Sequence, residues 1–140
     1  MKNLIKHILK ESAKEKFINT MVDKLKSGVI KAPYFKNLKK FAADDKEIEM
    51  IFKKLFGEGI RIVNDTYNHS YGIFNNEGNQ VYFENSIGFW NIWEYDERGN
   101  LVYEGNSYGW WQKKEYDEVN NLIYKENSRD GVLINKRWKI

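Results

Sequence analysis

The sequence predicts an α+β protein: a basic helical segment over residues 1–57, followed by an antiparallel β-meander over residues 58–140. Two observations support this prediction. After Gly57 the spacing of apolar residues changes from a helical period near 3.6 to a period of two. In addition, a unit of about 21 residues recurs through the second half, which is typical of supersecondary units that stack on one another. We expect about eight strands in the meander, and we expect the two segments to form one compact unit.

The first helix is expected between Leu4 and Leu25, where apolar residues recur at helical spacing. A capping-box pattern at Ser12 allows the helix to restart there. Gly28 follows a turn that is rich in lysine, and it is expected to end the helix. We do not expect the segment to be a secretory signal, because lysine and histidine interrupt its apolar residues.

Two shorter helices are expected before Gly57. Pro33 suits the first position of one helix. Asp44 is a suitable cap for the other, which Gly57 then ends. Their apolar faces follow from the spacing: Phe35, Leu38 and Phe41 for the first helix, and Ile48, Ile51, Phe52 and Leu55 for the second.

The second half is expected to consist of short strands joined by tight turns. The first two strands are predicted over residues 60–63 and 67–74, with a turn between them. In the central copy of the repeated unit, strands are predicted over residues 101–104 and 110–116. The third copy has an additional residue before Gly131, which predicts a widened turn or a bulge at that place.

The positions that recur within the unit have structural explanations. Gly78 and Gly99 are replaced by Asn120 in the third copy, and Asn is the residue that best tolerates the positive φ that glycine provides. Two sets of aromatic residues recur in register, and they are expected to stack across neighbouring strands. The first set is Tyr82, Tyr103 and Tyr124, and the second is Phe74, Tyr95, Tyr116 and Trp138.

The sequence contains no recognisable catalytic or metal-binding pattern. It has no cysteine, which removes thiolate metal sites and disulfides. His7 and His69 lie in different halves, and no nucleophile or zinc motif accompanies them. We therefore expect a protein that is not an enzyme and needs no cofactor or metal. Acidic residues that recur beside the turns are expected to be solvated; they are Glu94, Asp96, Glu97, Glu115, Asp117 and Glu118.

The composition also bears on location. No apolar run approaches the ~18–20 residues that a membrane-spanning helix needs, so we expect no membrane association. The lack of cysteine suits a reducing compartment. We expect the protein in the cytoplasm of a bacterial host.

Aromatic residues that differ between the copies are the candidate contacts for a partner. All five Trp residues lie in the second half, and alternation along the strands places bulky aromatic residues on both faces of the sheet. An uncovered aromatic face can anchor a partner, whereas curling of the sheet or self-association would bury it. The candidate partner-binding residues are Trp90, Trp93, Trp110, Trp111 and Lys113.

The two halves of the chain differ in charge. Residues 1–57 contain fourteen lysines and seven acids, a charge of +7, and residues 58–140 contain nine basic and thirteen acidic residues, a charge of −4. The basic segment is therefore a candidate for contact with nucleic-acid phosphates, and a solvated helix face is the alternative. The candidate nucleic-acid-binding residues are Lys36, Lys39, Lys40, Lys53 and Lys54.

Two segments share a short core motif. Tyr95 to Asn100 has the pattern Tyr-Asp-x-x-Gly-Asn, and Tyr116 to Asn121 has it with Asn120 in place of Gly. This core resembles the YD-type repeat of RHS-like proteins, over about residues 74–138, with Phe74-Asn75 departing further. The Asn-Ser-x-Gly-Trp between the motifs is similar to repeats in short proteins of phages and mobile elements. The resemblance implies a β-sheet scaffold for binding, and no catalytic residue.

Taken as a whole, the chain is expected to be a non-enzymatic binding protein that acts by occupying a protein or ribonucleoprotein partner. The concrete form of this hypothesis is a phage-encoded inhibitor of a bacterial defence system, of the anti-CRISPR type, that blocks an RNA-guided nuclease or its guide RNA. Its acidic aromatic sheet would mimic nucleic acid, or its basic helices would touch the guide. The alternatives are a carbohydrate- or surface-binding module and an immunity protein that neutralises a toxin.

Overall fold

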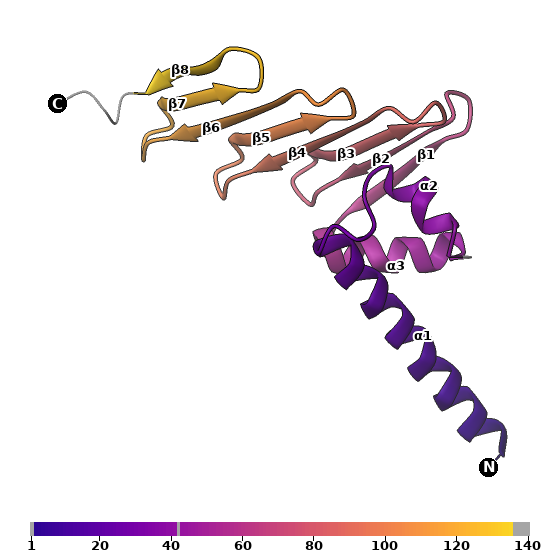
Figure 1. The fold of residues 1–140 in the computed structure, drawn as a ribbon. Coiled ribbons are helices and arrows are strands. Elements are labelled where there is room, and N and C mark those ends of the chain that lie inside the picture. Colours follow the sequence, from indigo (N-terminus) through magenta and orange to yellow (C-terminus); the bar gives the residue numbers. More distant parts are fainter. Residues whose placement is uncertain (1, 42, 136–140) are drawn as a thin grey trace. The chain divides into compact units, whose positions relative to one another are not determined.

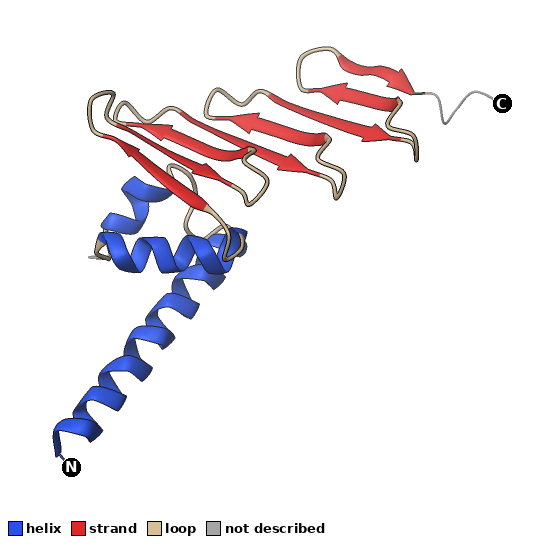
Figure 2. Cartoon of the chain, turned by 180° about the vertical axis from the view of Figure 1, so that it is seen from behind, coloured by secondary structure: helices blue, strands red, loops and turns tan. Residues whose placement is uncertain are grey.

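The computed structural model describes residues 2–41 and 43–135 and has the predicted α+β class (Figure 1). In this part of the chain, three helices precede one antiparallel sheet of eight strands (Figure 2). The chain divides into two compact units, residues 1–62 and residues 63–140. Trp138, expected at the end of the second aromatic set, lies outside the described residues.

Helix α1 spans Lys2–Lys26 without a break, so the restart that Ser12 would allow does not occur. The residues around Ser12 are mainly Lys, Glu, Ala and Leu, which are strong helix formers and carry the helix past a single serine. Gly28 follows the end of α1 with a φ of 79°. This left-handed conformation is typical of a residue just beyond a helix, so the expected stop is confirmed.

Helix α2, Tyr34–Lys39, lies where it was predicted, but Pro33 is the extended residue before the helix and not its first residue. Helix α3, Asp45–Phe56, is capped by Asp44, whose carboxylate accepts the backbone N–H of Glu47 at 2.8 Å. Such a cap satisfies a backbone donor that has no partner within the helix.

The buried apolar residues of the helical unit come from all three helices and from the segments between them. The rings of Phe35 and Phe52, with centroids 4.7 Å apart, are part of this core. Its members are Ile18, Met21, Val22, Leu25, Ile30, Phe35, Leu38, Ala43, Ile48, Ile51 and Phe52. Phe41 does not join them, because α2 ends at Lys39 and the residue leaves the apolar face; its side chain is 43% exposed.

The N-terminal part of α1 is exposed. Its four large apolar residues are each more than half accessible to solvent, although they recur at helical spacing; they are Leu4, Ile5, Ile8 and Leu9. The buried residues of α1 begin at Ile18, so only the C-terminal part of this helix contributes to the core of its unit.

The sheet is a meander in which each strand pairs with its neighbours in sequence (Figure 1). The strands are β1 Arg61–Asp65, β2 Ser70–Phe74, β3 Gln80–Asn85, β4 Trp90–Tyr95, β5 Leu101–Asn106, β6 Trp111–Tyr116, β7 Leu122–Asn127 and β8 Gly131–Asn135.

Some strand limits differ from the prediction. Strand β1 continues through Asp65, and the carboxylate of Asp65 binds both the backbone N–H and the side-chain amide of Asn68, at 3.0 and 2.7 Å. This turn occupies residues 66–69, so β2 begins at Ser70 and not at Tyr67. Strand β5 extends to Asn106, two residues beyond the predicted end, because its pairing with β4 continues to that residue.

The turns at one end of the sheet are organised by a single side-chain oxygen. Asp117 Oδ1 accepts the backbone N–H groups of Val119 at 3.0 Å and of Asn121 at 2.8 Å. Asp96 and Asn75 make the same pair of bonds in the two preceding turns of this end. In these three turns the positive φ falls on Gly78, Gly99 and Asn120, at 85°, 84° and 67°, which confirms the predicted substitution of Gly by Asn.

At the other end of the sheet, serines link neighbouring hairpins. The N–H of Ser107 donates to the carbonyl of Trp90 at 3.0 Å, and the N–H of Trp90 donates to Ser107 Oγ at 3.3 Å. Ser128 and Trp111 make the same pair of bonds at 3.0 and 3.1 Å. These bonds continue the backbone pairing into the turns.

The additional residue of the last hairpin produces the irregularity that was predicted. Pairing between β7 and β8 shifts in register between Lys125 and Glu126. The β3–β4 and β5–β6 pairs show no such shift. Asn127 Oδ1 accepts the N–H groups of Arg129 and Asp130, and Gly131, the first residue of β8, takes a φ of 71°. The irregularity is therefore a shift in strand pairing and not a widened turn.

Candidate binding surface of the sheet

Strand register assigns the predicted binding residues to two faces. Gly105 pairs with both Ile92 and Trp111, and Tyr103 pairs with Lys113. Because side chains alternate along a strand, these residues share one face with Trp90. We call it the Trp111 face, defined by Trp90, Ile92, Tyr103, Gly105, Trp111 and Lys113.

The remaining two candidates do not lie on the Trp111 face. Trp93 alternates with Ile92 and pairs with Glu104, so it lies on the opposite face of the sheet. Trp110 directly precedes β6, and its carbonyl accepts the N–H of Asn106 at 3.0 Å as part of a turn. The structure therefore brings together three of the five predicted residues: Trp90, Trp111 and Lys113.

Lys113 is the exposed member of this face, and it contacts Trp111. Trp111 is half-buried. Lys113 Nζ lies 5.3 Å from the centroid of the Trp111 ring, a cation–π contact of the kind that contributes about 0.5–1 kcal/mol at exposed sites. Its main effect is to hold an ammonium group above an aromatic surface.

Tyrosines on the same face lie along their own strands. The Tyr82 hydroxyl donates to Glu84 Oε1 at 2.7 Å, and the Tyr124 hydroxyl donates to Glu126 Oε1 at 2.8 Å. The Tyr103 hydroxyl takes the same course, but residue 105 is glycine. A Cβ placed on Gly105 would lie 2.8 Å from the Tyr103 hydroxyl oxygen.

The opposite face contains a polar network around Glu104. Glu104 Oε1 accepts the side-chain amide of Gln112 at 3.0 Å, and Oε2 accepts that of Asn91 at 3.3 Å. The Tyr95 hydroxyl donates to the carbonyl of Gln80 at 2.7 Å. Burial raises the pKa of Tyr95, and the negative charge of Glu104 raises it further. These groups bind one another, so this face is the less suitable one for a polar ligand.

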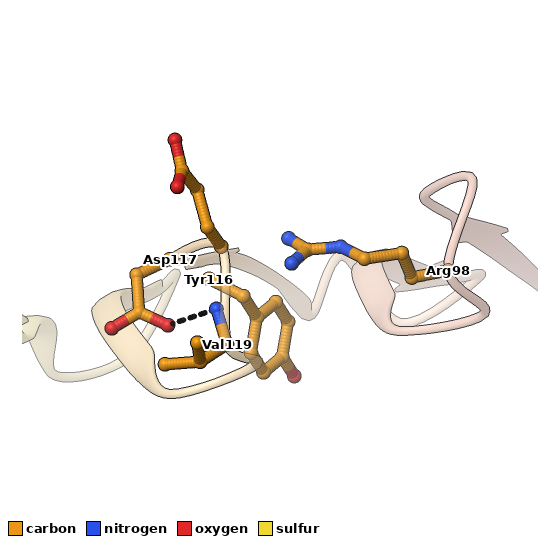
Figure 3. A pocket seen from close by; sticks show the side chains of 5 residues that line it. Arg98, Tyr116, Asp117 and Val119 are labelled. Atoms are coloured by element: carbon orange, nitrogen blue, oxygen red, sulfur yellow. Dashed lines mark hydrogen bonds between the residues drawn. The ribbon is translucent and has the colours of Figure 1, made fainter.

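A shallow hollow between two turns is lined by Arg98, Tyr116, Asp117, Glu118 and Val119, and Figure 3 shows Arg98 on the turn that precedes the other residues. The hydrogen bond from the Asn121 backbone is the largest cause that lowers the pKa of Asp117, and the side chain of Asn121 lowers it further. The Asp117 carboxylate thus already accepts hydrogen bonds from residues of its own turn. No group of three His, Cys, Asp or Glu residues suited to a metal ion occurs within residues 2–41 and 43–135.

The predicted nucleic-acid-binding lysines lie in the helical unit. Lys36 and Lys39 are on α2, Lys40 follows it, and Lys53 and Lys54 are on α3. Lys53 and Lys54 on α3 each contact a neighbouring side chain. Lys53 Nζ lies 3.2 Å from Glu49 Oε1, and Lys54 Nζ donates to Asn19 Oδ1 at 2.7 Å. Contacts between exposed charges contribute little, about 0–1 kcal/mol, and leave these lysines accessible. Their role in binding stays a prediction.

Sequence reasoning missed Tyr103 and Gly105 as parts of the candidate surface. Tyr103 was assigned to a structural ladder, as were Tyr82 and Tyr124. A signal was present in the sequence: residues 84 and 126 are Glu, whereas residue 105, midway between them, is Gly. Spacing shows this exception, but only the structure shows that the Tyr103 side chain lies over Gly105.

Two comparisons with known proteins, one with family models and one with curated sequences, found no match. The resemblance to YD-type repeats therefore stays a prediction from the motif alone. In the part of the chain that the structure describes, no helix has the length and apolar character needed to cross a bilayer.

Proposed function

We propose that the chain is a non-enzymatic binding protein that occupies a macromolecular partner through the Trp111 face. The single observation behind the proposal is the placement of Lys113 over the Trp111 ring, on the same face as Trp90. Aromatic side chains and cations on a preorganised surface are typical anchors of interfaces, because little conformational entropy is lost when they bind.

The scaffold belongs to the same proposal. We regard the sheet as a set of stacked 21-residue units, of which the turn residues and the Tyr positions maintain the fold. Hydrogen bonds that recur at this spacing support the idea: Asp96 and Asp117 each bind two N–H groups, and Ser107 and Ser128 each bind a Trp backbone. In this scheme the residues of the Trp111 face that differ between units determine the partner.

The concrete form of the function is inhibition of a bacterial RNA-guided nuclease. It is supported by the charge of −4 on residues 58–140 and by the aromatic Trp111 face, which together suit the basic channel of such a nuclease. The phage-type motif resemblance points the same way. A carbohydrate-binding module is the competing class, since a Trp ring on a sheet can also stack on a sugar.

The test compares face variants in a plasmid-interference assay. The chain is co-expressed with each of a panel of RNA-guided nucleases in a bacterial reporter strain. Wild-type chain should protect the plasmid, and Trp111→Ala should lose protection, since an interface anchor of this kind is worth about 2 kcal/mol or more. Trp93→Ala, which alters the opposite face, is the matched control and should protect like wild type.

The proposal fails in its nuclease form if interference stays intact across the panel and affinity purification at low and high salt recovers no nuclease or ribonucleoprotein. Binding on a glycan array that is lost in Trp111→Ala would assign the surface to the carbohydrate class. Rescue of toxin-treated cells would instead assign the chain to the immunity proteins.

A further inference from the structure

We propose that Tyr103, Gly105 and Lys113 form an acceptor site for a carboxylate, and that the partner fills it with the Glu or Asp side chain of a protein. The inference rests on the proposed function, since it names the chemistry that the Trp111 face would recognise. It starts from the three tyrosines that lie along their strands. Two of them donate to a Glu two residues further on, and the third has glycine there.

Glycine at position 105 is not required by the backbone. Its φ lies outside the left-handed region, in contrast to turn glycines such as Gly99 and Gly109. Gly105 is an interior residue of β5, where glycine is normally unfavourable by about 0.5–1 kcal/mol relative to alanine. What distinguishes the position is its cover: Gly105 is buried, and the hydroxyl end of the Tyr103 ring lies over it. Among the described residues, no hydrogen bond of that hydroxyl is found.

Two donors lie on this part of the face, on the directly paired residues Tyr103 and Lys113. The Tyr103 hydroxyl lies over Gly105, and Lys113 Nζ lies over the ring of Trp111. Gly105 and Trp111 are direct cross-strand partners, and the Cβ positions of such partners are about 4.5–5.5 Å apart. A neutral hydroxyl donor and a cation side by side are what a carboxylate needs, because its two oxygens accept both bonds at once.

The molecule itself indicates which acceptor fits. At the corresponding places along β3 and β7, the tyrosine hydroxyl is bound by a Glu carboxylate, at 2.7 and 2.8 Å. Glu126, the other cross-strand neighbour of Lys113, already accepts the Tyr124 hydroxyl. At position 105 the chain lacks the corresponding carboxylate. Gly105 itself is buried beneath the Tyr103 side chain, so a carboxylate from outside has to reach the Tyr103 hydroxyl from its solvent side.

The surroundings favour a protein carboxylate over a nucleic-acid phosphate. Ile92 and Trp111 flank the site with apolar surface, and Glu94 and Glu115 lie on the same face by alternation. Residues 58–140 carry a charge of −4, which repels a polyanionic backbone more strongly than a single acidic side chain. An acidic residue within an apolar protein segment is therefore the occupant that the site fits best.

The experiment uses two pools of random 12-residue peptides on the immobilised full chain, one with a fixed central Glu and one with Gln. Wild-type chain should retain the Glu pool about tenfold better, as expected for a hydrogen bond to a charged group. Gly105→Glu should abolish this preference, because the new carboxylate binds Tyr103 as Glu84 and Glu126 bind their tyrosines. Tyr103→Phe and Lys113→Met should each reduce it, and Trp93→Ala should leave it unchanged.

Folding of Gly105→Glu is checked by Trp fluorescence and circular dichroism, and Tyr103→Phe provides a second variant that adds no atoms. Equal retention of the two pools by wild type, or a Glu preference that survives in Gly105→Glu, overturns the inference. So does preferential retention of a random single-stranded RNA pool, or a wild-type dimer that Gly105→Glu disperses. If Gly105→Glu still protects in the nuclease assay while Trp111→Ala does not, the proposed function stands and only the carboxylate site is wrong.

Discussion

At the scale of single residues, a side-chain acceptor fixes each turn at one end of the sheet. Asn75, Asp96 and Asp117 occupy corresponding places, and each binds the N–H groups two and four residues further on. Such bonds let a short polar side chain replace part of the backbone pairing that is lost at a turn. Asn and Asp make the same two backbone bonds here. Asp96 and Asp117 differ from Asn75 in their charge and in accepting the side-chain amides of Asn100 and Asn121.

This difference gives a pH-dependent prediction for Asp117→Asn. The pKa of Asp117 is lowered in the folded chain, chiefly by the N–H of Asn121, from an unfolded value of about 3.9. A lowered folded pKa contributes stability that is complete above the unfolded pKa and is lost as the pH falls through the folded value. The variant should therefore be less stable than wild type at pH 7 and should match it below the folded pKa.

The measurement is the free energy of unfolding of the sheet from urea titrations at several values between pH 7 and pH 2. Trp fluorescence reports on the sheet segment, since all Trp residues lie in the second half. Asn75→Asp is the matched control, because it adds a titrating group to the equivalent turn. Its difference in stability from wild type should have the opposite sign: the variant should be more stable at pH 7, and the difference should vanish at low pH. A stability difference between Asp117→Asn and wild type that stays constant with pH would contradict this explanation.

At the scale of elements, the hairpin turns depend on one left-handed residue each. Gly99 has a φ of 84°, and Asn120 holds the corresponding place at 67°. Gly99→Ala should lower the free energy of unfolding by about 1–2 kcal/mol, because a Cβ disfavours this conformation. No atom lies within 4 Å of a Cβ at Gly99, so packing does not contribute to the loss. Gly99→Asn should cost clearly less, because Asn tolerates positive φ.

Urea denaturation followed by Trp fluorescence measures both Gly99 variants. Gly105→Ala is a useful comparison within β5, where φ is not positive and the new Cβ meets the mobile end of the Tyr103 side chain. Equal losses for Gly99→Ala and Gly99→Asn would show that the turn does not require the left-handed conformation.

Much of this element structure was predictable. The change of period at Gly57 placed the helices and strands, and Gly28, Asp44 and Gly57 bound the helices as expected. Strand limits were less predictable, because they depend on how far a turn reaches. The side chain of Asp65 binds Asn68 within the turn, and the alternation of apolar and polar residues does not predict such a bond. As a result β2 starts at Ser70, three residues later than predicted.

The candidate surface was predictable only as far as alternation along the strands determines it. Alternation places Trp90, Trp111 and Lys113 on one face and Trp93 on the other. It says nothing of the direction in which a side chain leans along its strand. The Tyr103 side chain lies over Gly105, so the relation between these two residues is known only when the conformation of the tyrosine is known.

At the scale of the whole sheet, hydrogen bonding between strands joins only strands that are consecutive in the sequence, from β1 to β8. In such arrays stability is approximately a sum of nearest-neighbour terms, so a strand that has one neighbour opens more easily than a strand that has two. Strand β8 has only β7 beside it in the described sheet, and Val132 and Leu133 are 52% and 48% exposed.

Hydrogen exchange should therefore show a gradient of protection along the sheet. Backbone amides of β8 should exchange at least about tenfold faster than hydrogen-bonded amides of β5, because opening β8 disrupts one strand interface, whereas opening β5 disrupts two. Exchange followed by mass spectrometry on short peptides separates β5 from β8, and a second pH confirms that exchange reports on equilibrium opening. Gly99→Ala weakens the turn between β4 and β5, so it should lower protection there before it affects β8. Uniform protection of β5 and β8 would mean that the sheet opens as one cooperative block, and neighbour pairing alone would then not explain its stability.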